Sequence, residues 1–374
     1  MSFTSFDLHP ELLRAVAALD FTVPTPIQKD ANPPACAGRD VLACAMTGSG
    51  KTAAFLLPIL QRLLGRPPGV TRALVLAPTR ELAAQIDEQR RALARFTRVT
   101  GAAVFGGARL DRLEVLVLDE ADRMLDMGFL PDIRRIMKLL PARRQTMLFS
   151  ATLPPEITAL ARELLRDPAT INVERPAAPA VGITHAAYPV AAELKLPLLV
   201  ELLRQPGVRN ALVFTRTKHR ANRVAEGLGR RGVRAERIHG NRSQAQRTQA
   251  LAAFKAGTAR VLVATDIAAR GIDVTGLSHV VNFDVPPAPE DYIHRVGRTA
   301  RAEAVGDAVT LVSPAEESDL RAIERAVRTR IERVTLPHFD YATRPAERLE
   351  IPLAQRLAAM RAQRHGAHTR PSHS

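Results

Sequence analysis

Apolar runs recur along the first half of the chain, and most are followed by a polar signature and then by a helical pattern. The runs lie at residues 40–44, 73–77, 114–118 and 146–149. None of them alternates polar and apolar positions, which is typical of strands that are covered on both faces. The pattern therefore predicts a parallel sheet wrapped by helices, an α/β fold.

The same scheme repeats in the second half of the chain. Its apolar runs lie at residues 211–214, 260–264, 279–283 and 308–312. A chain of 374 residues is long enough for two hydrophobic cores and too long for one. We therefore expect two parallel-sheet domains in tandem.

Composition sets the expected limits of the domains. Residues 1–175 form the first domain and residues 183–335 the second, while residues 176–182 lie in a stretch rich in Pro and Ala that is typical of a linker. The remainder, residues 336–374, is rich in Arg, His and Pro. We expect it to be a basic, partly disordered tail with one short helical stretch at 354–364.

One strand-like run does not fit the scheme. Only residues 106–113 separate the run at 99–105 from the run at 114–118, and a parallel crossover needs about a dozen residues or more. We therefore predict that residues 99–105 are shifted, antiparallel or a loop. The first sheet should then have a gap or an exposed edge.

Candidate chemistry follows the first run, in the loop Ala-Met-Thr-Gly-Ser-Gly-Lys-Thr. Glycines let backbone N–H groups surround phosphates, Lys51 can reach the outer phosphates, and the Thr52 hydroxyl can bind Mg²⁺. The expected nucleotide contacts in this loop are Ala45, Thr47, Gly48, Ser49, Gly50, Lys51 and Thr52. Taken alone, the loop also fits an ordinary Gly-rich turn.

A group of acids follows the third run, in the tetrad Asp119-Glu120-Ala121-Asp122. Asp119 can hold the Mg²⁺ shell, and Glu120 can orient or deprotonate an attacking water. Acids are also common at helix starts, because the helix dipole favours them there. The two elements together, each at the end of an apolar run, favour an NTP-hydrolysing protein over both simpler readings.

Charge and composition restrict the partners. The chain has 53 Lys and Arg against 38 Asp and Glu, a formal net charge of +15, which indicates a polyanionic partner or a generally basic surface. With 4% aromatic residues and no Trp, backbone contact is favoured over base stacking. No apolar run approaches a bilayer span and no signal-peptide pattern is present, so we expect a cytoplasmic protein without membrane contact.

Further motifs resemble those of DEAD-box RNA helicases, from Phe6 to about Pro337. The segment Phe-Thr-Val-Pro-Thr-Pro-Ile-Gln at 21–28 is similar to the family's Q motif. The resemblance implies that Gln28 hydrogen-bonds the adenine edge and that Phe21 stacks on the ring. ATP is then the expected nucleotide, with Mg²⁺ as its companion ion.

Motifs of both halves resemble the family's RNA-binding motifs. They are Pro-Thr-Arg-Glu-Leu at 78–82, the Gly-Gly signature at 106–107, Ile-His-Gly-Asn-Arg-Ser-Gln at 238–244 and Ala-Thr-Asp-Ile-Ala-Ala-Arg-Gly-Ile-Asp at 264–273. The resemblance implies RNA contacts by Arg80, Gly107, Gly240, Arg247 and Thr265. Grip through phosphates and sugars is independent of base sequence, so RNA of any sequence is the expected partner.

The segment His-Arg-Val-Gly-Arg-Thr-Ala-Arg at 294–301 resembles the motif that brings two arginines to the γ-phosphate. The resemblance implies this role for Arg298 and Arg301, which would stabilise charge in the transition state, and a ribose contact for Asp273. It also implies that Ser-Ala-Thr at 150–152 couples the two activities. The expected coupling residues are Asp122, Ser150, Thr152 and His294.

The chain departs from the family between Gly107 and Leu113. The family has there a strand, a Thr-Pro-Gly-Arg motif and a helix, so the shortfall is roughly forty residues, about one βα unit. No Thr-Pro-Gly-Arg occurs in the chain. A second RNA-binding element of the first domain is therefore expected to be missing. Ala300 and residues 330–337 most resemble the bacterial RhlE-like branch.

Three hypotheses follow for the function. The first is an ATP-dependent RNA helicase that couples ATP hydrolysis to RNA binding and local duplex unwinding. The second is an RNA-binding protein whose ATPase is uncoupled from unwinding by the missing unit. The third, a metabolic P-loop kinase, is disfavoured because such a kinase does not need a second domain with an arginine motif. Protein partners are not indicated by the sequence.

Overall fold

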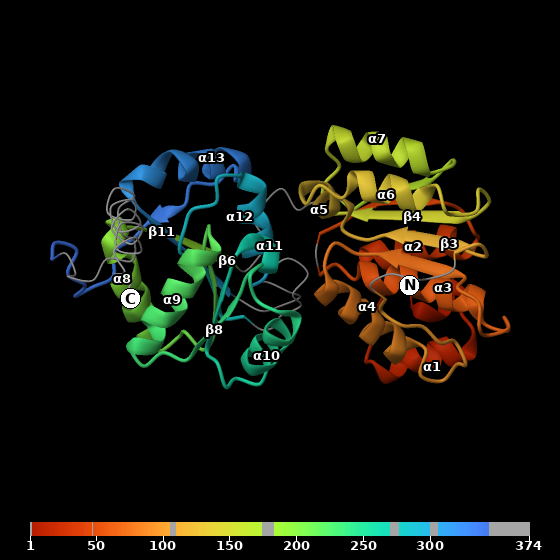
Figure 1. The fold of residues 1–374 in the computed structure, drawn as a ribbon, viewed down its shortest axis with the longest axis horizontal. Helices are drawn as coiled ribbons and strands as arrows, with labels where there is room; N and C mark the ends of the chain where they lie inside the picture. The colour runs from red at the N-terminus through yellow and green to blue at the C-terminus, as the bar shows by residue number, and fades with distance from the viewer. Residues whose placement is uncertain are drawn as a thin grey trace, which may run out of the picture. The chain divides into compact units, whose positions relative to one another are not determined.

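The computed structural model describes residues 2–46, 48–104, 110–173, 183–269, 277–299 and 306–343. These residues form two compact units, the first ending at residue 173 and the second starting at residue 183 (Figure 1). The expected linker and the helical stretch expected at 354–364 lie outside the described residues. Each unit is a parallel sheet covered by helices, as predicted.

The sheet of the first unit has five parallel strands in the order β2-β3-β4-β1-β5. In chain order they are β1 (Val41–Cys44), β2 (Ala73–Leu76), β3 (Val115–Leu118), β4 (Gln145–Ser150) and β5 (Ala169–Asn172). The four predicted runs are β1 to β4. The sequence analysis missed β5, because Ile171 is its only buried residue.

Side chains of successive strand residues point to opposite faces, so each face of this sheet has its own core. Val115 and Val117 belong to the core under one set of helices, and Leu116 and Leu118 to the core under the other. The first set is α1 (Pro10–Ala18), α2 (Pro26–Cys36), α3 (Lys51–Leu63) and α4 (Arg80–Leu93), preceded by the 3₁₀ helix η1 (Phe3–Phe6). The second set is α5 (Ala121–Asp126), α6 (Leu130–Met137) and α7 (Pro155–Leu164).

The sheet of the second unit has seven parallel strands in the order β12-β6-β11-β10-β7-β9-β8. The predicted runs became β7 (Ala211–Phe214), β9 (Val261–Ala264), β10 (His279–Asn282) and β11 (Gly306–Val312). The strands without a predicted counterpart are β6 (Ile183–Pro189), β8 (Ala235–Ile238) and β12 (Glu332–Arg333). All three are largely half-buried or exposed, so they lack a continuous apolar run.

Helices and a C-terminal segment complete the second unit. Its helices are α8 (Lys195–Arg204), α9 (Lys218–Arg230), α10 (Gln244–Lys255), α11 (Asp266–Ala269), α12 (Pro289–Val296) and α13 (Glu317–Val327), with the 3₁₀ helices η2 (Ala192–Leu194) and η3 (Pro314–Glu316). Leu336, Phe339 and Tyr341, which the sequence analysis placed in the tail, pack against its core. The N–H of Leu336 donates to the Tyr341 hydroxyl at 2.9 Å.

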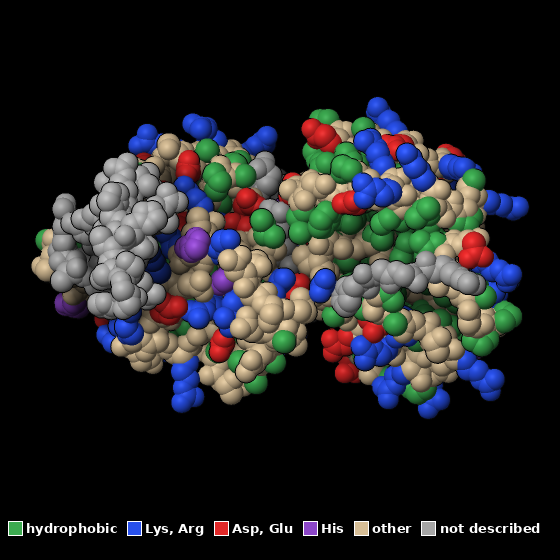
Figure 2. All heavy atoms as spheres, in the orientation of Figure 1, with side chains coloured by type: hydrophobic (Ala, Val, Ile, Leu, Met, Phe, Trp, Pro, Cys, Tyr) green, Lys and Arg blue, Asp and Glu red, His purple; other side chains and the backbone are tan. Residues whose placement is uncertain are grey.

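The run at 99–105 is displaced, as predicted from the short connection. Residues 99–104 contain no strand, and Phe105 lies outside the described residues. Strand β2 therefore forms one edge of the sheet, and all four of its residues are half-buried. A groove of about 1010 Å³ is lined by β2 and by residues 98–104, among others. Figure 2 shows a band of hydrophobic side chains across the visible face of this unit.

The ladder between β2 and β3 shows which backbone groups face the open edge. The carbonyl oxygens of Arg72 and Leu76 accept from N–H groups at the two ends of β3. The backbone N–H and C=O groups of successive strand residues point to opposite sides of the strand. The N–H and C=O of Leu74 therefore also face β3, while those of Ala73 and Val75 point outward. No backbone hydrogen bond joins β2 to the described residues 98–104.

We predict that proline is tolerated at Val75 and not at Leu74. Leu74→Pro removes a donor from the β2–β3 ladder, whereas Val75→Pro removes an N–H that faces away from it. The first variant should lose about 2 kcal/mol more stability than the second. Urea unfolding of the full chain, followed by circular dichroism, measures the difference. Equal losses would show that the ladder direction deduced for β2 is wrong.

Candidate functional site

The predicted chemical groups of the first unit leave three neighbouring strands at the same edge of the sheet. Strands β3, β4 and β1 are adjacent and parallel, with Leu118 opposite Leu148 and Cys44 opposite Ser150. The Gly-rich loop follows β1, the acid tetrad follows β3, and residues 150–152 begin at the last residue of β4. This edge, at the carboxyl ends of the strands, is where open α/β sheets bind ligands.

The Gly-rich loop is held against β4 and leads directly into a helix. The N–H of Ala45 donates to the carbonyl of Ser150 at 3.0 Å, and the buried Lys51 ammonium donates to the carbonyl of Ala45 at 2.8 Å. Helix α3 begins at Lys51, so the free N–H groups of its first turn face the loop. Such a turn is suited to hold phosphate.

Gln28 joins the predicted Q motif to this loop. Its side-chain N–H donates to the carbonyl of Gly50 at 3.1 Å, and its side-chain oxygen accepts from the N–H of Thr25 at 3.0 Å, which is one half of a capping box at the start of α2. Gly50 has a φ of +95°, and a Cβ there would lie 2.5 Å from the Gln28 nitrogen. Only glycine fits this position.

Phe21 lies in an aromatic group with the residues of η1. Its ring stacks on Phe3 with the ring centres 6.4 Å apart and the planes at 26°, and Phe3 meets Phe6 edge to face at 5.8 Å. Phe6 is buried, and Phe21 is half-buried at the border of the core. Phe21 therefore has a fixed position beside the start of the Q motif.

Asp119 is a buried acid that lacks a partner for one oxygen. It is 2% exposed, and its Oδ1 has no hydrogen bond to the described residues. Burial raises the pKa of Asp119 to about 7, against a lowering by Lys51 and a further rise caused by Glu120. A buried carboxylate with a free oxygen close to a phosphate-binding loop fits a bound cation, as expected for Mg²⁺.

Glu120 and Arg123 form a buried ion pair, and the sequence analysis did not single out Arg123. A guanidinium N–H of Arg123 donates to Oε2 of Glu120 at 2.7 Å. Glu120 and Arg123 are 3% and 1% exposed. The spacing i, i+3 at the start of α5 was a signal in the sequence, because residues three apart share one helix face.

Asp122 connects the acid tetrad to residues 150–152, as expected for the coupling group of the first unit. Its Oδ2 accepts from both the N–H and the hydroxyl of Thr152 at 2.9 Å, and its own N–H donates to the Ser150 hydroxyl at 3.2 Å. The end of β3 is thereby tied to the end of β4 by side chains as well as by the ladder.

In the second unit, two described residues with an expected role at the nucleotide lie in α12 or directly after it. His294 lies in α12 and is half-buried, and Arg298 follows the helix and is buried. Four of the predicted site residues, Thr47, Gly107, Asp273 and Arg301, lie outside the described residues.

Arg295 holds α12 against the strand ends, and the sequence analysis missed it. Its guanidinium binds both oxygens of Asp266 at 2.6 and 2.7 Å, the Asn282 side chain at 3.1 Å and the Asp284 carbonyl at 2.8 Å. Arg295 is 2% exposed. It therefore joins the start of α11 and the end of β10 to the helix that precedes Arg298.

The residues expected to contact RNA lie at strand ends and helix starts. Arg80 is exposed at the first position of α4, behind the capping Thr79. Gly240 and Thr265 follow the adjacent strands β8 and β9, with the N–H of Thr265 donating to the Ile238 carbonyl at 3.3 Å. Arg247 lies in α10, which follows β8. The described residues among the expected RNA contacts thus follow a strand end or lie in the first turns of a helix.

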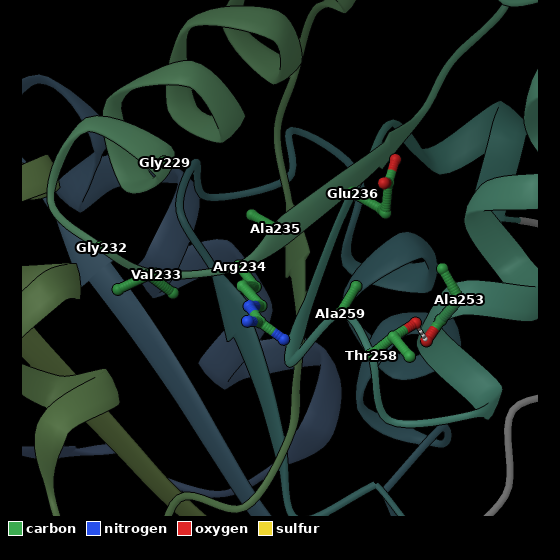
Figure 3. Close-up of a pocket in the computed structure, with 9 residues that line it drawn as sticks. All are labelled: Gly229, Gly232, Val233, Arg234, Ala235, Glu236, Ala253, Thr258 and Ala259. Atoms are coloured by element: carbon green, nitrogen blue, oxygen red, sulfur yellow. Dashed lines mark hydrogen bonds between the residues drawn. The ribbon is translucent and has the colours of Figure 1, made fainter.

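A pocket of about 500 Å³ in the second unit lies elsewhere (Figure 3). It is lined by the end of α9, the start of β8 and the turn after α10. None of the predicted site residues lines it, and the Thr258 hydroxyl within it donates to the Ala253 carbonyl at 2.9 Å. The pocket is at the opposite end of β8 from Gly240, so it plays no part in the predicted site.

The two parallel α/β units and the phosphate-binding edge define a nucleotide-hydrolysing protein with tandem RecA-like domains. The DEAD/DEAH box helicase family matches residues 25–111 and 102–160, and the helicase conserved C-terminal domain matches residues 194–303. The chain belongs to the DEAD-box ATP-dependent RNA helicases.

Relatives of known name agree with this assignment. The chain is 38% identical to the DEAD-box ATP-dependent RNA helicase CshA of Geobacillus kaustophilus, over 94% of this chain and 82% of the relative, and 38% identical to CshA of Bacillus subtilis, over 91% and 76%. Its structure is similar to that of S. cerevisiae Dbp5 bound to RNA and ADP BeF3, with a TM-score of 0.81, 30% identity and coverage of 89% and 95%. Within the described part of the chain, no helix has both the length and the apolar character needed to cross a membrane.

We predict that Gly50→Ala weakens binding of a fluorescent ATP analogue by about 10-fold or more, because the new Cβ meets Gln28 and the backbone is left-handed. Gly65→Ala is the matched control, since Gly65 has a φ of +74° and open space around a Cβ. It should carry the backbone strain without changing affinity. Fluorescence titration measures both variants, and equal effects would exclude the contact with Gln28 as the cause.

We predict that Asp119→Asn stabilises the nucleotide-free protein at pH 8. The folded pKa of Asp119 lies near 7 against an ordinary 3.8, so the native state binds a proton that the unfolded state has lost, and stability falls as pH rises through this window. Thermal unfolding without Mg²⁺ should show a higher midpoint for the variant at pH 8 and a shrinking difference toward pH 4. Asp87→Asn should act oppositely at pH 8, because hydrogen bonds from Arg90 and Arg91 lower the pKa of Asp87 against its desolvation.

Proposed function

We propose that this helicase hydrolyses ATP by in-line attack of water on the γ-phosphate and couples hydrolysis to RNA binding and local duplex unwinding. The observation that carries the proposal is the convergence of the phosphate loop, the acid tetrad and the Asp122–Thr152 contact on three adjacent strand ends. A single sheet edge of the first unit then holds nucleotide, water and coupling group together.

The first unit holds the phosphates and the metal in this proposal. Lys51 and the N–H groups of the loop bind the phosphates, Thr52 and Asp119 hold Mg²⁺, and Glu120 orients the attacking water. When bound, Mg²⁺ neutralises charge on the phosphates. The free Oδ1 of buried Asp119 supports this assignment. Phe21 and Gln28 recognise adenine.

The second unit completes the site in this proposal. Arg298 and Arg301 stabilise charge that develops on the γ-phosphate, and Asp273 binds the ribose. His294 joins Asp122 in coupling hydrolysis to RNA. The network around Arg295 supports the role of Arg298, because it fixes the helix from which that arginine emerges.

RNA is bound through its backbone and without base specificity. Arg80 and Gly107 make the contacts of the first unit, and Gly240, Arg247 and Thr265 those of the second. The net charge of +15 supports a polyanionic partner, and basic side chains occur over the visible surface of both units (Figure 2).

The domain limits and the cellular location also stay proposals. We propose a first domain at 1–175, a linker at 176–182, a second domain at 183–335 and a tail at 336–374, in a cytoplasmic protein. Within the proposed tail, Leu336, Phe339 and Tyr341 pack against the core of the second unit.

We further propose that one βα unit with the Thr-Pro-Gly-Arg motif is missing between Gly107 and Leu113. The DEAD/DEAH box match falls into two overlapping pieces, and the alignment with the Geobacillus protein has 382 positions, more than the 374 residues of this chain. The open edge of β2 is in line with this. Ala300 and residues 330–337 favour the RhlE-like branch within the family.

The missing unit favours a second candidate function. Without the RNA contacts of the Thr-Pro-Gly-Arg motif, the protein would bind RNA and hydrolyse ATP without bending and opening a duplex. It would then be an RNA-binding protein with an uncoupled ATPase. This alternative leaves the ATP-site chemistry unchanged, because β1, β3 and β4 all keep their sheet neighbours.

We predict RNA-stimulated ATP hydrolysis that Lys51→Ala and Glu120→Gln each reduce by about 100-fold or more, because each variant removes a group that acts at the γ-phosphate or its water. Phosphate release with and without single-stranded RNA measures the effect, and strand displacement of a short duplex measures unwinding. Stimulation together with displacement supports the helicase, and stimulation without displacement supports the uncoupled form. ATP binding without any stimulation would contradict the coupling in the proposed mechanism.

A further inference from the structure

The three carboxylates of the acid tetrad have different hydrogen-bond partners. Asp119 leaves one oxygen without a hydrogen bond to the described residues, and Asp122 is held by Thr152. Glu120 has a charged partner of its own, since Arg123 donates to its Oε2 at 2.7 Å. The Lys51 ammonium donates to the carbonyl of Ala45. Arg123 thus forms an ion pair with Glu120, while its N–H also donates to Oδ1 of Asp122 at 3.1 Å.

Arg123 also takes part in holding the backbone of Glu120. Glu120 has a φ of 56° and a ψ of 52°, a left-handed conformation that is uncommon for a residue with a side chain. Its carbonyl accepts from the N–H of Arg123 at 3.0 Å and of Met124 at 3.2 Å. Arg123 therefore binds Glu120 at two points, its main chain and its carboxylate.

The Glu120–Arg123 ion pair is buried, so its two charged groups must stay in contact. Glu120 and Arg123 are almost without solvent contact, and a buried charge is costly unless its partner is in place. A charge-assisted hydrogen bond to one oxygen restricts the rotation of the carboxylate. With Oε2 engaged, Oε1 is the oxygen left to face a water molecule.

We propose that Arg123 is a positioning residue for hydrolysis, which orients the Glu120 carboxylate so that Oε1 faces the attacking water. This inference rests on the proposed function of Glu120. It assigns to Arg123 an effect on turnover and none on nucleotide binding. A purely structural ion pair would instead change the amount of folded protein.

The test compares Arg123→Met and Arg123→Lys, each alone and in a Glu120→Gln background, at saturating RNA. Arg123→Met should lower kcat by about 10-fold or more while KM for ATP stays within about 3-fold, because binding does not involve this group. Arg123→Lys keeps a charge that can reach the carboxylate and should recover most of the loss. In Glu120→Gln, the change at Arg123 should lower kcat no further.

A second readout uses the protein without nucleotide. Arg123→Met should lower the thermal midpoint more in the wild-type background than in Glu120→Gln, because only the first leaves a buried carboxylate without its cation. Binding of a fluorescent ATP analogue should be equal in all folded variants. These measurements separate misfolding from misplacement of Glu120.

Two results would overturn the inference. One is an unchanged kcat in folded Arg123→Met. The other is an equal loss of kcat in the Glu120→Gln background, which would show an effect that does not pass through Glu120. An active wild type with either result refutes this inference alone, whereas a wild type without ATPase activity refutes the proposed function and this inference with it.

Discussion

The parallel pairing of β3, β4 and β1 is the constraint on which the site of the first unit depends. These strands are buried on both faces or nearly so, and their ladder places residues 45–52, 119–122 and 150–152 at one sheet edge. No direct contact between the three loops is needed to bring them together, because their register follows from the core. The strands already bring these loops together. The hydrogen bonds of Asp122 with Thr152 and of Ala45 with Ser150 then add to that arrangement.

The same edge concentrates features that weaken the fold. Asp119 is buried with an unpaired oxygen, Glu120 has a left-handed backbone, and Gly48 and Gly50 have positive φ angles. The unpaired buried oxygen and the left-handed backbone of Glu120 each oppose folding, whereas glycine adopts a positive φ without steric strain. The two unfavourable features persist because the cores on the two faces of the sheet hold the strands in place, with Phe55 and Phe149 on one face and Leu148 on the other. The stability of the core thus maintains a site that is arranged to bind a charged ligand.

The sequence predicted the buried part of the fold and much of the site, and its failures have a common physical reason. Continuous apolar runs predicted eight strands correctly, whereas β5, β6, β8 and β12 are partly exposed and leave no continuous apolar signal. Glycines, Lys51 and the acid tetrad were recognisable because their chemistry requires those residue types in that order. Arg123 and Arg295 were missed because any exposed helix can carry an arginine at such positions, and only the folded chain shows that both are buried in ion pairs.

The open edge of β2 has unequal consequences for the two activities. The ATP-binding loops leave β1, β3 and β4, each of which keeps its neighbours in the sheet. Arg80 instead starts the helix that follows β2 itself, and among the described strands β2 pairs only with β3. An edge strand has fewer ladder hydrogen bonds that resist its displacement. Movement of β2 would therefore first shift Arg80, and with it the RNA contact that Arg80 is expected to make. The loops expected to bind ATP are therefore attached to strands with neighbours on both sides, and the start of α4 is not.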